Sequence, residues 1–195
     1  MGNKLRITLS FPGIVIFDPI TLTSFLNEKK ITTPDLITYF NSNEEVGEEV
    51  ILQGAIIPIY PIPDLDYTIF VNLENQVNKS PIPVEWKLFE TEPFPLKVSS
   101  ELVIISDIEA IMDWEEEFFV NYENYLDDRS GSNDYTKIPK GNYGVSIIGY
   151  CEPNKGPEAD YGYILNFQSV SNLPTFKFTK SIDEYNFVVD PLKKQ

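Results

Sequence analysis

Apolar and polar residues alternate with a period of two along much of this chain. The alternating runs lie at 6–11, 67–73, 84–88, 143–147, 161–167, 176–178 and 185–189, and a run at 102–105 is apolar on both faces. A period of two is typical of half-buried β-strands. Because proline, glycine and asparagine turns separate the runs, the pattern predicts a mainly β protein, α+β at the margin, built as an antiparallel β-sandwich with one or two short helices.

Proline marks where these predicted strands end. The chain has 15 prolines, and Pro58, Pro61 and Pro63 interrupt one apolar run. Proline cannot donate a hydrogen bond to a sheet, so we expect an edge of a sheet at 58–63. We find no internal repeat and no low-complexity linker, and 195 residues fit one domain, so we expect a single domain over 1–195.

Two segments have the signals of short helices. Thr33-Pro34-Asp35 offers an N-cap, a first-turn proline and an acid, followed by apolar residues up to Phe40. A second helix is predicted from Ser106, because Glu109 follows at the spacing of a capping box. Its far end has two interpretations. The helix either continues to Phe119, or it ends near Trp114 and a strand runs from Glu117 to Tyr122; the alternation of Phe118, Val120 and Tyr122 favours the strand.

Composition excludes several classes of function. The chain has no histidine, so it contains no Ser-His-Asp or Cys-His site and no zincin motif. Its single cysteine, Cys151, can form no internal disulfide. We expect no enzyme, no cofactor and no metal. Two alternatives stay open: a carboxylate-pair glycosidase, which needs only two acids, and a calcium site in Asp127–Asp134, which lacks the EF-hand spacing.

The negative charge is concentrated in two stretches. Thirty acids against 15 bases give a net charge of −15, and 18 of the acids lie where there is no lysine or arginine. One stretch, 31–78, carries Asp35, Glu44, Glu45, Glu48, Glu49, Asp64, Asp66 and Glu74; the other, between Lys97 and Arg129, carries ten acids. Such a charge favours basic partners and repels nucleic acid and anionic membranes.

Aromatic residues are interleaved with the acids of the second stretch, which suits an interface with apolar anchors and a charged rim. The alternative is that the aromatic residues are core and the acids a solvated face. The residues that we predict to bind a partner are Asp107, Glu109, Asp113, Trp114, Glu115, Glu116, Glu117, Glu123, Asp127 and Asp128.

The N-terminal region gives no sign of a membrane or export segment. Thr8, Ser10, Pro12 and Gly13 interrupt its apolar residues, and no apolar run approaches the length of a membrane span. We therefore expect a cytoplasmic protein that does not contact membranes.

A turn near the C-terminus carries a resemblance. Ile138-Pro139-Lys140-Gly141-Asn142-Tyr143 leads into the strand ending at Tyr150, and a polar loop then precedes Ala159 to Leu165. This arrangement resembles the C-terminal part of competence protein J, a bacterial family of small acidic inhibitors of a DNA-uptake nuclease, and 7–17 resembles its first strand. Immunity proteins of bacterial toxin systems are similar in size and acidity. The resemblance implies inhibition of a nuclease by direct binding and assigns no contact residues.

These observations lead to one hypothesis and one alternative. The hypothesis is an acidic immunity or inhibitor protein that binds a basic toxin or nuclease and covers its cationic surface. The alternative is a non-catalytic structural or scaffold module of a larger bacterial or phage assembly, acidic for solubility alone.

Overall fold

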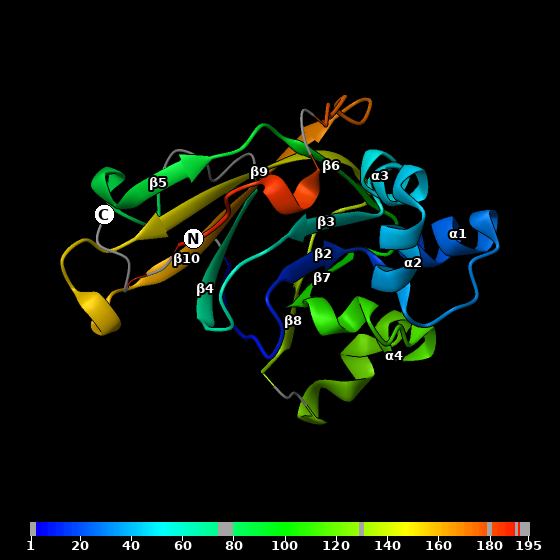
Figure 1. Cartoon of the computed structure of the whole chain (residues 1–195), viewed down its shortest axis with the longest axis horizontal. Coiled ribbons are helices and arrows are strands. Elements are labelled where there is room, and N and C mark those ends of the chain that lie inside the picture. The colour runs from blue at the N-terminus through cyan, green and yellow to red at the C-terminus, as the bar shows by residue number, and fades with distance from the viewer. Residues whose placement is uncertain (1–2, 74–79, 129–130, 179–180, 190, 192–195) are drawn as a thin grey trace.

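Two β-sheets and a group of helices form the molecule (Figure 1). The computed structural model describes residues 3–73, 80–128, 131–178, 181–189 and 191, without the side chains of 126–128 and 183. The larger sheet contains, in spatial order, β1 (Asn3–Thr8), β4 (Asp66–Leu73), β10 (Tyr161–Val170), β9 (Gly141–Cys151) and β5 (Lys87–Glu90), with β6 (Phe94–Val98) also paired to β9. The smaller sheet contains β3 (Ile56–Ile59), β2 (Ile14–Phe17), β7 (Leu102–Asp107) and β8 (Asn133–Lys137).

The predicted fold class is confirmed, because most of the regular structure is strand and the strands form two sheets. Every neighbouring pair of strands is antiparallel except β4 and β10, which run parallel. The predicted edge at 58–63 is also found in part, since β3 ends at Ile59 and is an edge strand of the smaller sheet.

One apolar core joins the two sheets. β2 and β7 are buried along their whole length, as expected for β-branched runs covered on both faces. Their side chains share a continuous cluster with Ile69 of β4 and Leu165 of β10. At one side the edge strands β1 and β8 also meet, where the Asn3 side chain donates a hydrogen bond to Thr136 Oγ1 at 2.9 Å. The larger sheet therefore packs on the smaller one.

Four α-helices lie in the described part of the chain and gather at one end of the molecule, which we call the helical end (Figure 1). They are α1 (Pro19–Lys29), α2 (Leu36–Ser42), α3 (Glu44–Leu52) and α4 (Glu116–Val120). Short 3₁₀ helices occupy Val84–Trp86, Ile108–Ile111, Tyr122–Asp128, Gly156–Glu158 and Ile182–Glu184. None of the helices in the described residues is long and apolar enough to cross a bilayer.

Asp18 joins the helical end to the smaller sheet. It is fully buried and is the N-cap of α1, where its Oδ1 accepts the Thr21 N–H at 2.9 Å. Its Oδ2 accepts the N–H groups of Ser99 and Ser100 and the Ser100 hydroxyl, at 2.7–2.9 Å. A buried carboxylate is stable when several donors surround it, as they do here.

Both predicted helices are shifted in the structure. The first is α2, which begins after Asp35; the Asp35 carboxylate accepts the Thr38 N–H at 3.0 Å, so Asp35 and not Thr33 is the N-cap. This hydrogen bond lowers the pKa of Asp35. The predicted start at Ser106 is wrong, because Ser106 still belongs to β7 and Asp107 caps the 3₁₀ helix that follows.

The predicted strand from Glu117 to Tyr122 is wrong, because the segment contains α4. The residues it buries are Phe119 and Tyr122, which are three positions apart, a helical spacing. The longer helix to Phe119 is wrong too: the chain leaves the helical conformation between Ile111 and Glu116.

Three predicted strands also need correction. The run at 84–88 begins as a 3₁₀ helix, so β5 starts only at Lys87. The runs at 176–178 and 185–189 form no strand in the described residues. Phe176, Phe187 and Val189 are nevertheless buried, and the Phe176 ring stacks on Phe94 with ring centroids 4.3 Å apart. These runs alternate because an extended segment turns every second side chain toward the core, and it does so here without pairing to a strand in the described residues.

Candidate protein-binding surface

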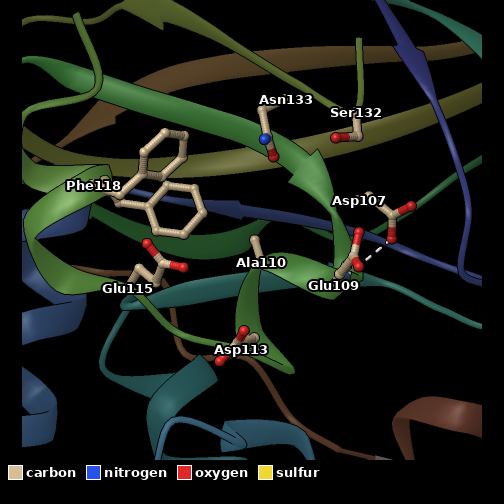
Figure 2. A pocket seen from close by; sticks show the side chains of 9 residues that line it. Asp107, Glu109, Ala110, Asp113, Glu115, Phe118, Ser132 and Asn133 are labelled. Carbon is tan, nitrogen blue, oxygen red and sulfur yellow. Dashed lines mark hydrogen bonds between the residues drawn. The ribbon is translucent and has the colours of Figure 1, made fainter. Parts of the chain in front are cut away.

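A hollow lies where β7 ends and the chain turns toward α4 (Figure 2). It encloses about 260 Å³ and combines carboxylates with aromatic rings. It is lined by Asp107, Glu109, Ala110, Asp113, Glu115, Phe118, Phe119, Ser132 and Asn133. Four of the residues predicted to bind a partner therefore come together in one place, brought there by β7, the 3₁₀ helix Ile108–Ile111 and the loop before α4.

Three carboxylates form what we call the acidic rim: Glu109, Asp113 and Glu115. Figure 2 shows them around Ala110, with Phe118 close to Glu115. All three are exposed, and no ion pair involves them among the described residues. Three negative charges in one hollow produce a negative potential, and this potential attracts a cation.

Glu116 and Glu117 extend the acidic rim along α4. Both are exposed, and in the described part of the chain neither has an ion pair. Glu123 differs, because its Oε1 lies 2.8 Å from Lys137 Nζ, and this hydrogen bond raises the pKa of Lys137. The predicted residues Asp127 and Asp128 have side chains outside the described part of the structure.

Asp107 is built into the fold beneath the acidic rim. Only 1% of it is exposed, and its Oδ2 accepts the N–H groups of Ser10 and Phe11 at 2.5 and 3.1 Å. Its Oδ1 accepts the Glu109 N–H at 3.0 Å. Asp107 therefore fixes the loop after β1 against the start of the 3₁₀ helix, and it positions Glu109 for any partner.

We expect Asp107→Asn to destabilise the protein by about 2–4 kcal/mol, because an amide group replaces one of the two accepting oxygens of this buried side chain and leaves a backbone N–H without its acceptor. Asp113→Asn is the matched control. Asp113 is exposed and its side chain has no hydrogen bond in the described structure, so we expect a change within about 0.5 kcal/mol. Urea unfolding followed by tryptophan fluorescence measures both, and equal stabilities would contradict the structural role of Asp107.

The aromatic residues of the segment divide between core and surface. Trp114 stacks on Phe119 with centroids 5.1 Å apart and meets Phe17 edge-on at 5.6 Å, so its ring faces the core. Phe118 is half-buried beside the acidic rim, and its ring lies 5.3 Å from that of Tyr125. Met112 and Tyr125 are 36% and 38% exposed. The surface anchors available to a partner are thus Phe118, Tyr125 and Met112 rather than Trp114.

The other base-free stretch contributes acids to the same end of the molecule. The backbone N–H of Trp114 donates a hydrogen bond to the Pro34 carbonyl at 2.9 Å, which joins the segment before α2 to the segment before α4. Glu44, Glu45 and Glu48 of α3 are exposed and without an ion pair in the described residues. α3 and α4 lie together at the helical end (Figure 1), so this end carries acids from two segments that are far apart in sequence.

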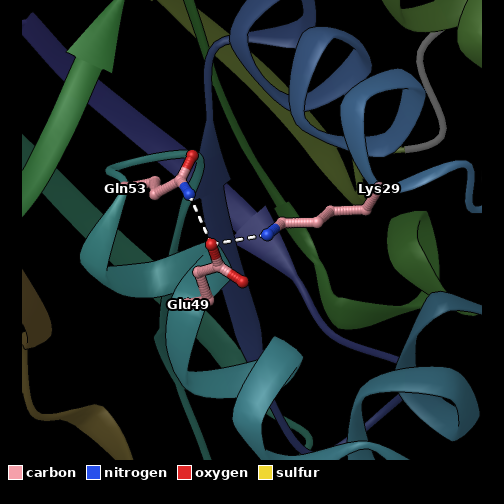
Figure 3. A network of polar contacts seen from close by, with 3 residues as sticks. All are labelled: Lys29, Glu49 and Gln53. Carbon is pink, nitrogen blue, oxygen red and sulfur yellow. Dashed lines mark hydrogen bonds and ion pairs between the residues drawn. The ribbon is translucent and has the colours of Figure 1, made fainter.

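One acid of α3 is neutralised. Glu49 Oε1 lies 2.6 Å from Lys29 Nζ and 2.7 Å from Gln53 Nε2 (Figure 3). This ion pair joins the end of α1 to α3. Glu49 is consequently part of the fold of the helical end, whereas the three other glutamates of α3 face solvent.

No protein-family model matches the sequence, and no curated protein sequence matches it. Among solved structures, the chain is similar to an inhibitor of a DNA-degrading activity. That protein is ComJ from Bacillus subtilis, described as the inhibitor of the DNA-degrading activity of NucA, and the match has 15% identity, covers 86% of this chain and 96% of that chain, and has a TM-score of 0.46. It is the inhibitor family that the turn at 138–143 resembles.

Proposed function

We propose that this chain is an inhibitor that binds a basic nuclease or toxin through the helical end and covers the cationic surface with which that enzyme holds nucleic acid. The observation that carries the proposal is the acidic rim around an aromatic hollow, without ion pairs in the described structure. Acids left without counter-charge repel one another, so such a surface lowers the stability of the free chain. Binding of a basic partner would offset that repulsion.

The hollow suits one kind of group from the partner. A lysine or arginine side chain that entered it would place its cation among Glu109, Asp113 and Glu115 and its stem against Phe118. Glu116 and Glu117 would then face further bases at the edge of the contact. A central apolar anchor with a charged rim is the usual anatomy of a tight interface.

The same carboxylates do not favour the glycosidase alternative. A glycosidase keeps its general acid protonated in buried, apolar surroundings. Glu109, Asp113 and Glu115 are all exposed, and Asp107 is held by three N–H donors. Binding of a cation is the better use of this arrangement.

An inhibition assay tests the proposal. We expect the chain to abolish DNA cleavage by a basic nuclease that it binds, at one chain per enzyme. The variant Glu109→Gln/Asp113→Asn/Glu115→Gln should raise the inhibition constant at least tenfold, because three charges that attract the partner are lost. Glu44→Gln/Glu45→Gln/Glu48→Gln removes the same charge from α3 and should change it less. Full DNA cleavage in excess chain would favour the scaffold alternative instead.

A further inference from the structure

At the end of the molecule opposite the helical end, the larger sheet has an edge to which no strand of the described residues pairs. β5 is the last strand in the order of the larger sheet and pairs only with β9 (Figure 1). In the part of the chain that the structure describes, no strand pairs with its outer side. An exposed edge is a template on which a further strand can pair.

Two apolar residues at this edge are exposed to solvent, beside the charged Lys87 and Glu90 of β5. Val84, just before β5, is 82% exposed, and Leu88 within it is 38% exposed. Trp86 is half-buried, and its ring lies 6.5 Å from that of Tyr150 in a small apolar cluster on the outer face of the sheet. Exposed apolar residues at an edge favour pairing with a further strand.

The charges of β5 are complementary to those of a second β5. Lys87 lies opposite Tyr150 and Glu90 opposite Ile148, so both face the outer side of the sheet, while Phe89 lies opposite Gly149 and packs on Phe187. Leu88 is the extra residue of a bulge. Because the bulge leaves Leu88 out of the register, Lys87 and Glu90 are the paired positions on either side of Phe89. A two-fold axis through Phe89 would therefore place Lys87 of one copy opposite Glu90 of the other, twice.

We propose that β5 pairs edge to edge, antiparallel, with β5 of a second copy of this chain, about a two-fold axis at Phe89. Pairing would cover Val84 and Leu88 and exchange the Lys87–Glu90 ion pair of 2.6 Å within each copy for two pairs between copies. Because β5 lies away from the helical end (Figure 1), the two helical ends of such a pair would point away from each other. Their repulsion is then weak, because salt screens charges beyond about 8 Å at physiological ionic strength.

Sedimentation velocity of the full chain over a range of concentrations tests the pairing. We expect a reversible monomer–dimer equilibrium, which Leu88→Glu abolishes. Leu52→Glu is the matched control, because Leu52 is 39% exposed at the end of α3, and it should leave the dimer unchanged. A single species of monomer mass at every concentration, or equal loss of dimer in both variants, would overturn the proposal.

Charge exchange supplies a second test that a loss of folding cannot imitate. Lys87→Glu and Glu90→Lys should each weaken the dimer about tenfold or more, because each places like charges opposite one another twice. An equimolar mixture of the two variants should restore a heterodimer, since every facing pair is then opposite in charge. Absence of this rescue, with both variants folded by circular dichroism, would refute the proposed register.

Discussion

Gly162→Ala should be the most damaging single substitution in the described chain, lowering the free energy of unfolding by more than about 4 kcal/mol. Gly162 is the second residue of β10 and lies beside Thr68 in the parallel pairing with β4. Its φ is +150°, and an added Cβ would lie 2.8 Å from the Thr68 carbonyl carbon, 2.9 Å from its nitrogen and closer still to its oxygen. The obstruction is backbone, so no rotamer change can relieve it.

Gly156→Ala is the control for backbone conformation alone. Gly156 has φ +55°, and an added Cβ would meet nothing within 4 Å. We expect a loss of about 1 kcal/mol, because the left-handed conformation costs alanine about 1–2 kcal/mol and the reduced freedom of the unfolded chain offsets part of this. Urea unfolding measures the control, and soluble yield with far-ultraviolet circular dichroism reports a Gly162→Ala chain that fails to fold. Similar stabilities would show that β4 and β10 do not approach each other this closely.

Strands with alternating sequences could be predicted, and β4, which buries alternate side chains over most of its length, is the clearest case. The predicted positions of β4 and β10 are close to the observed ones, although β10 is buried on both faces from Gly162 to Leu165. The parallel pairing of β4 with β10 could not be predicted, since period two does not encode the direction of a neighbour. The close approach at Gly162 follows from that pairing, and in the sequence it is only a glycine between two tyrosines.

Helices α1 and α3 were missed for identifiable reasons. Gly47 lies in the middle of α3, where glycine normally weakens a helix. In the structure an added Cβ at Gly47 would lie 3.0 Å from the Phe40 carbonyl oxygen, so the glycine allows α3 to pack on α2. α1 did have a signal, because Asp18-Pro19 offers the same N-cap and first-turn proline that indicated the helix after Asp35.

The sequence predicts which segment is acidic, but it does not predict how the acids of that segment are arranged on the folded surface. The absence of bases between Lys97 and Arg129 identified Glu109, Asp113 and Glu115, which the structure places around one hollow. The sequence cannot show that Asp107 is buried beneath these three residues, because an aspartate in an acidic segment is expected to face solvent. The contribution of α3 was hidden as well, because it depends on the folding of two distant segments to one end.

Reversing the charge of Glu115, Glu116 and Glu117 to lysine should slow association with the proposed basic partner about tenfold at low salt. The three side chains are exposed and continue the acidic rim along α4. Each substitution changes the charge by two, so the net charge moves from −15 to −9. Electrostatic steering accelerates association by about 10–10³-fold, and it acts on the rate of association more than on that of dissociation.

Salt dependence separates steering from damage to the interface. Stopped-flow association rates of the wild-type chain should fall steeply as salt rises, whereas those of the variant should change little. The two should converge near 1 M salt, where the Debye length is only about 3 Å. A variant that associated slowly at every salt concentration would indicate lost contacts instead of lost steering.

The matched control places the same charge change on the other acidic helix. Glu44→Lys/Glu45→Lys/Glu48→Lys also gives −9, and Glu44 and Glu45 stand in the first turn of α3 as Glu116 and Glu117 stand in that of α4. Both variants lose similar helix-dipole stabilisation, about 0.3–1 kcal/mol per acid. If the partner docks on the rim side of the helical end, the α4 variant should slow association more. Equal rates for the two variants would mean that net charge, and not the acidic rim, attracts the partner.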